Sequence, residues 1–124
     1  MPSDKAKDWR LIKDPKRGTY CYLIGIDRWA IELKECEFNS LNKLLNKLYQ
    51  QFIQMHSELM DEELVSLEIE DLSWYAELEG DKTNWSLRII HETSEDIRSF
   101  EMYWPIPIAK DLFFEMRKMW ESMH

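Results

Sequence analysis

The sequence predicts an α+β domain in which about seven antiparallel strands pack against two helices. Several short segments alternate apolar and polar residues with a period of two, which is typical of half-buried strands. One long segment instead carries apolar residues at alternating spacings of three and four, which indicates a helix. The order along the chain is three strands, a helix, four strands and a second helix, and the helices supply the cover that one-sided sheets need.

The first three strands are expected at Trp9–Ile12, Tyr20–Ile24 and Trp29–Leu33. Pro15 and Gly18 favour a turn after the first strand, and Gly25–Asp27 reads as a tight connection after the second.

The long helix is expected from about residue 36 to residue 61. Its stripe consists of Phe38, Leu41, Leu45, Leu48, Phe52, Met55 and Leu59. The stripe is compatible with a coiled-coil seam or a groove-binding helix. We favour packing on the protein's own sheet, because fewer than four heptads are present.

The period returns to two after this helix. The expected strands are 65–70, 74–79, 85–89 and 98–104, with a hairpin loop at Gly80–Asn84 and a polar loop at Glu92–Asp96. Pro105 and Pro107 end the last strand, and Pro107 is placed to open a helix that runs from Ile108 to Met123.

Length and charge limit the possible functions. The 124 residues suit one domain, expected at residues 9–124 after a disordered N-terminal segment at 1–8. The net charge is −8, and it is uneven, because residues 1–34 hold eight basic against five acidic residues. An acidic body argues against strong binding to nucleic acid or anionic lipid. No leader or apolar span is present, so we expect a cytoplasmic protein without membrane contact.

The sequence carries no recognisable catalytic motif. The three glycines stand singly, and His56, His91 and His124 lack the spacing of metal ligands. Cys21 and Cys36 have no neighbouring base and are expected to be reduced. We therefore expect no enzyme activity, no cofactor and no metal.

Two charged regions are candidates for binding. The acidic cluster Glu68, Glu70, Asp71, Glu77, Glu79 and Asp81 suits a divalent cation or a basic partner, or forms a solvated sheet face that discourages aggregation. Basic residues near aromatic ones can contact a partner or stack single-stranded bases. This candidate contact set is Arg10, Lys13, Lys16, Arg17, Tyr22 and Arg28.

Several ordered phrases carry a family resemblance. They are Asp8–Leu11, Leu23–Gly25, Trp29–Leu33, Glu58–Glu63, Trp74, Leu78–Gly80 and Trp85–Arg88. The chain resembles an uncharacterised family of cyanobacteria and chloroplasts, a domain of unknown function, over residues 8–120. That family is similar in fold to Whirly proteins and positive cofactor four, single-stranded-DNA-binding transcriptional regulators whose unit is four strands and a helix, used twice. At Lys34, where a hydroxyl residue is expected as the helix cap, the sequence departs from this pattern.

The resemblance implies a Whirly-like fold but transfers no catalytic residue. Our leading hypothesis is a non-catalytic interaction domain that binds a protein partner. The alternative is weak single-stranded nucleic-acid binding or transcriptional regulation, which the acidic body opposes.

Overall fold

The computed structural model describes residues 8–92 and 99–123. The segment expected to be disordered therefore lies, apart from Asp8, outside the described residues. The strands are β1 (Trp9–Lys13), β2 (Tyr22–Ile26), β3 (Trp29–Leu33), β4 (Val65–Asp71), β5 (Trp74–Gly80), β6 (Trp85–His91) and β7 (Phe100–Trp104). The helices are α2 (Glu35–Met55) and α3 (Ile108–Glu121), with short 3₁₀ turns η1 (Pro15–Arg17) and η2 (His56–Glu58).

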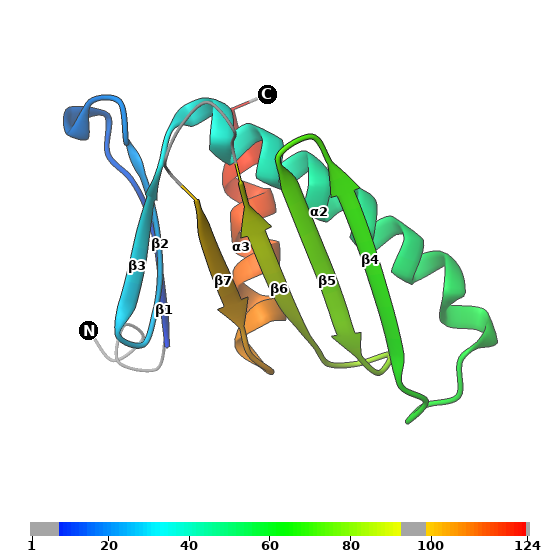
Figure 1. The fold of residues 1–124 in the computed structure, drawn as a ribbon. Helices are drawn as coiled ribbons and strands as arrows, with labels where there is room; N and C mark the ends of the chain where they lie inside the picture. Colours follow the sequence, from blue (N-terminus) through cyan, green and yellow to red (C-terminus); the bar gives the residue numbers. More distant parts are fainter. Residues whose placement is uncertain (1–7, 93–98, 124) are drawn as a thin grey trace.

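The strands form two antiparallel sheets, which confirms the α+β class. One sheet has the order β1-β2-β3 and the other β4-β5-β6-β7. Both helices lie behind the four-stranded sheet in Figure 1, and no described element lies over its opposite face, the uncovered face. The four-stranded sheet therefore has one face in the core and one face toward solvent, with β4 and β7 as its edges.

The start of α2 explains why a hydroxyl cap is dispensable. Lys34 is the N-cap residue, and its backbone N–H donates to Glu37 Oε1 at 2.9 Å. The Glu37 side chain thus reaches back and satisfies the donor that precedes the first turn. Glu35 and Glu37 also place negative charge at the positive end of the helix.

The end of α2 differs from the prediction of residue 61. The α-helix ends at Met55, η2 follows, and Leu59 is already extended with φ −96° and ψ 139°. Leu59 is nevertheless buried. The apolar stripe continues past Met55 because the 3₁₀ turn still directs Leu59 to the core, so its spacing does not mark the helix end.

One hydrophobic core joins both sheets to both helices, as expected. It includes Trp74, Leu78, Trp85, Leu87 and Trp104 from the four-stranded sheet together with the α2 stripe of Phe38, Leu41, Leu45, Leu48 and Phe52. Trp29, Ile31, Leu67, Ile69 and Phe100 pack against it while remaining partly exposed. The two sheets are therefore parts of one packed unit.

The prediction for β2 is wrong by two residues. The strand runs to Ile26, and Gly25 pairs with Arg10 on one side and Ala30 on the other. The turn is formed by the next two residues, and Asp27 takes φ 52° in it. Gly25 thus lies within the ladder, with a neighbouring strand on each side, and the Arg10 side chain lies over it.

The last strand begins at Phe100, and the predicted start at Arg98 lies outside the described residues, as does most of the predicted loop Glu92–Asp96. Helix α3 follows Pro107 as predicted and ends at Glu121. Cys21 and Cys36 are free thiols. Among residues 8–92 and 99–123, no helix combines the length and hydropathy that crossing a membrane requires.

Candidate functional site

The structure divides the predicted contact set between the two ends of the three-stranded sheet. Arg28 lies in the β2–β3 turn, whereas Lys16 and Arg17 lie in η1 at the other end. Five strand residues, about 16 Å at ~3.3 Å each, separate the two ends. Arg17 also forms an ion pair with Glu32. The basic residues do not form one continuous binding groove.

Tyr22 is a correction to the prediction of an accessible aromatic ring. Its side chain is 0% exposed and stacks on Phe38 with ring centroids 3.9 Å apart. The hydroxyl group donates to Met123 Sδ at 3.1 Å. Burial, with smaller contributions from Cys21 and Glu35, raises the pKa of the phenol. Tyr22 is a core residue, and no base can stack on it.

Arg10 is held against the outer face of the three-stranded sheet. Its Nη2 donates to the Trp29 carbonyl oxygen at 3.1 Å, and Nη1 lies 3.5 Å from the Asp27 carbonyl oxygen. The guanidinium covers Gly25 so closely that an added Cβ would lie 2.4 Å from Nη2. Arg10 thus has a structural contact of its own.

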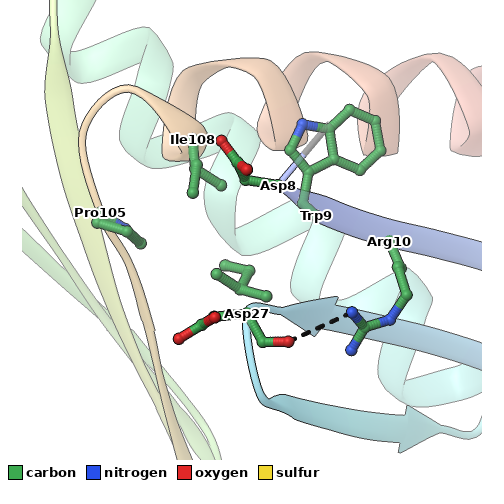
Figure 2. A pocket seen from close by; sticks show the side chains of 7 residues that line it. Asp8, Trp9, Arg10, Asp27, Pro105 and Ile108 are labelled. Carbon is green, nitrogen blue, oxygen red and sulfur yellow. Dashed lines mark hydrogen bonds between the residues drawn. The ribbon is translucent and has the colours of Figure 1, made fainter. Parts of the chain in front are cut away.

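A hollow of about 480 Å³ lies where the three-stranded sheet meets the start of α3. Figure 2 shows Asp8 just before β1, Trp9 at the start of β1, Asp27 after β2, and Pro105 and Ile108 on the opposite side. A second hollow of about 420 Å³ shares Asp8, Trp9 and Ile108.

The lining of these two hollows combines carboxylates with apolar and aromatic side chains. It is Asp8, Trp9, Arg10, Ile26, Asp27, Pro105, Pro107, Ile108, Asp111, Phe114 and Glu115, without a histidine, cysteine, serine or lysine. Its ionisable groups are the carboxylates of Asp8, Asp27, Asp111 and Glu115 and the guanidinium of Arg10. Across the described part of the chain, no three His, Cys, Asp or Glu side chains are grouped to hold a metal ion.

The uncovered face of the four-stranded sheet carries most of the predicted acidic cluster. Cross-strand register places Glu68, Glu77, Arg88 and Tyr103 in one row. Arg88 Nε donates to Glu101 Oε2 at 2.6 Å, and Arg88 Nη1 lies 3.8 Å from Glu77 Oε1. The hydrogen bond from Arg88 to Glu101 and the charge of that carboxylate raise the pKa of Arg88.

Strand β4 forms one edge of this sheet. It pairs with β5 alone among the described strands. In a two-residue hairpin the flanking residues, here Asp71 and Trp74, exchange backbone hydrogen bonds. Alternation then directs the N–H and C=O groups of Ser66, Glu68 and Glu70 away from β5. The edge thus presents three residues with outward-facing backbone groups.

Exposed apolar side chains stand at both ends of β4. Leu64, directly before the strand, is 79% exposed, and Leu72, directly after it, is 100% exposed. Leu72 also has φ 54°, a left-handed conformation that β-carbon sterics disfavour in leucine. Met60, a few residues upstream, is 78% exposed. An open sheet edge flanked by exposed leucines is unusual, because sheet edges are ordinarily protected from pairing with other chains.

Sequence reasoning missed the two leucines and also a basic group on the helices. Lys43 and Lys47 of α2 line a cleft of about 470 Å³ with Arg117 of α3, beside Asp71 and Glu121. The sequence analysis considered only the apolar stripe of this helix and not its lysines. The leucines did carry a signal, since each occupies a turn or connection where polar residues are the rule.

The comparisons with known proteins give a family without an assigned activity. A solved structure of a protein of unknown function from the DUF155 family of Prochlorococcus sp. NATL2A is similar, with a TM-score of 0.84 and 36% identity over 93% of this chain and 95% of that chain. No curated protein matches. The family model for DUF1818, a domain of unknown function, matches residues 4–119. The chain therefore belongs to the DUF1818 family of domains of unknown function.

Proposed function

We propose that this chain is a non-catalytic interaction domain that binds a protein partner by adding a strand of the partner to β4. The observation that carries the proposal is the outer edge of β4, unpaired among the described residues and flanked by the exposed Leu64 and Leu72. Strand addition to an open sheet edge is a common mode of peptide recognition.

The physical gain comes from two sources. Backbone hydrogen bonds to Ser66, Glu68 and Glu70 give the added strand its register. Covering a leucine side chain contributes roughly 1.5–3 kcal/mol when burial is complete. Leu64 and Leu72 together therefore offer enough apolar surface to offset part of the entropy lost when a partner segment is ordered.

Binding of single-stranded nucleic acid is the second candidate. It is supported by the resemblance to Whirly-like proteins and by a hollow of about 440 Å³ on the outer face of the three-stranded sheet. That hollow is lined by Tyr20, Leu23, Ala30 and Glu32. We rank it second because Tyr22 is buried, Arg17 is paired with Glu32, and the larger sheet face is acidic.

Affinity capture with matched variants tests the first candidate. Ser66→Pro removes one outward N–H without removing a hydrogen bond to β5, since proline is tolerated at strand edges on the solvent side. Ser66→Ala is the control that keeps the N–H. We expect the parent and Ser66→Ala to capture a specific protein from cell extract that Ser66→Pro does not capture. Equal recovery with all three baits, each shown to be folded by circular dichroism, would refute binding at this edge.

A further inference from the structure

We propose that the strand accepted by β4 is cationic, with lysine or arginine alternating with apolar residues. This inference rests on the proposed function and deepens it, because it names the chemistry of the partner segment. It derives from the charges and the two faces of β4.

Two carboxylates on the uncovered face of β4, Glu68 and Glu70, have no cationic partner among the described residues. Among residues 8–92 and 99–123, no salt bridge is formed by Glu68, Glu70 or Asp71. Glu68 Oε2 accepts a hydrogen bond from the Tyr75 hydroxyl group at 3.1 Å. This donor is neutral, so it does not balance the charge of the carboxylate. Arg88 lies two strands away and already contacts Glu77 and Glu101. The charges of Glu68 and Glu70 are therefore left without a paired cation among the described residues, whereas Asp71 lies at the cleft lined by Lys43, Lys47 and Arg117.

The geometry of paired strands determines which positions of an added strand face these carboxylates. Side chains directly opposite each other in an antiparallel pair lie about 4.5–5.5 Å apart at Cβ, where opposite charges attract and like charges repel. Ser66, Glu68 and Glu70 share the uncovered face. An added strand thus gains attraction by placing lysine or arginine at alternate positions on that face.

The core-facing side of β4 determines which residues suit the remaining alternate positions of the added strand. Val65, Leu67 and Ile69 are half-buried beside α2, and among the described strands none lies on their outer side. An added strand would place its alternate side chains next to these three. Valine, isoleucine or leucine at those positions extends the core by one strand.

The same charges disfavour a second copy of this chain. Full antiparallel overlap of two β4 strands would set Glu68 against its own copy and place both Glu70 side chains on the same face. Like charges directly opposite each other are destabilising. A heterologous basic segment fits this edge better than self-association does.

The test uses three synthetic, fluorescently labelled peptides that match β4 in length, with valine and isoleucine at alternate positions. The positions between them hold lysine, threonine or glutamate. Fluorescence anisotropy is measured with the full chain at about 25 mM and about 150 mM salt. We expect the lysine peptide to bind about 3- to 10-fold more tightly than the threonine peptide at low salt, with a smaller ratio at high salt, and the glutamate peptide to bind weakest.

Two variants make the result specific. In Glu68→Gln/Glu70→Gln the lysine peptide should lose its advantage over the threonine peptide, while Ser66→Pro should weaken both. Equal affinity of the parent for the lysine and threonine peptides would overturn the cationic inference and leave strand addition intact. Binding of no peptide, unchanged binding by folded Ser66→Pro, or a dimer of the parent in sedimentation that Ser66→Pro abolishes would overturn partner docking at β4 itself.

Discussion

Two glycines of the same chain should respond differently to the same substitution. An alanine Cβ at Gly80 would lie 2.3 Å from the Asn84 carbonyl oxygen and 2.5 Å from Trp85 Cα, which are backbone atoms that cannot move alone. At Gly25 the nearest atom is the end of the exposed Arg10 side chain. We expect Gly80→Ala to lower the free energy of unfolding by about 2–3 kcal/mol, and Gly25→Ala to stay within about 1 kcal/mol of the parent. Urea denaturation measures both, and similar losses would contradict the account.

Asp81 gives the hairpin loop after β5 a defined pH dependence. Its Oδ1 accepts hydrogen bonds from Thr83 N at 2.9 Å and from Asn84 N at 3.0 Å. The bonds from Asn84 and Thr83 hold the pKa of the carboxyl group below its ordinary value of 3.8. A lowered pKa in the folded state adds stability above pH 3.8, and this stability is lost as the pH falls through the folded pKa.

Asp81→Ala should therefore be less stable than the parent at neutral pH, with a difference that shrinks below about pH 4. Thermal unfolding across a pH series measures the difference, and Glu62→Gln, at an exposed position, serves as the control. A gap between parent and Asp81→Ala that persists unchanged into strong acid would show that the carboxylate form is not what the loop needs.

Residue-level prediction from the sequence worked for the core and failed at Tyr22. Alternation placed Trp74, Trp85 and Trp104 in the core, where they are buried. Tyr22 was placed in the contact set because it was assigned to the less apolar face of its strand and lies near basic residues in the sequence. The strand continues to Ile26, and Tyr22 falls on the same face as the buried Ile24 and Ile26.

At the scale of elements, α2 is the main cover of the four-stranded sheet. Leu45 and Leu48 are almost completely buried on its inner face. We expect Leu45→Ala or Leu48→Ala to lower the free energy of unfolding by about 2–5 kcal/mol. Gln51→Ala, on the exposed side of the same helix, should change it by less than about 0.5 kcal/mol. If all three variants share the parent's urea midpoint, α2 does not stabilise the fold through this face.

The existence of each strand and helix was predictable, but several boundaries were not. Period-two and 3–4 spacings reflect burial, so they locate an element wherever burial continues. Burial continues beyond α2 to Leu59 through a 3₁₀ turn, and the stripe therefore overstates the helix. At Gly25 the local propensity favours a break, yet pairing with β1 on one side and β3 on the other continues the strand to Ile26.

For the whole molecule, charge distribution predicts weak binding of single-stranded nucleic acid. The basic residues of the N-terminal sheet lie at both of its ends, and the uncovered face of the other sheet is acidic. We expect labelled oligo-dT to bind weakly at physiological ionic strength, with a shallow salt dependence, since few counterions are released. Fluorescence anisotropy across a salt series decides this. Tight binding that a Lys16→Ala/Arg17→Ala variant abolishes would reverse the ranking of the two candidate functions.

The proposed site could not be found from the sequence because it depends on sheet order. An edge strand and a central strand can share the same alternation, and only the arrangement of the chain shows that β4 has an unpaired side. The acidic cluster was visible in the sequence, but the sequence did not show that Glu77 contacts Arg88 while Glu68 and Glu70 form no ion pair with a described cation. Leu64 and Leu72 became candidate contact residues only because the structure places them at the two ends of that open edge.

Amide hydrogen exchange by NMR tests most directly whether β4 is an open edge that accepts a partner strand. In the free chain, the amides of Ser66, Glu68 and Glu70 should exchange quickly, while those of Leu67 and Ile69, bonded to β5, should exchange slowly. Adding the lysine peptide should slow exchange at Ser66, Glu68 and Glu70. Slow exchange at these three amides in the free chain, or no change when the peptide is bound, would contradict the account.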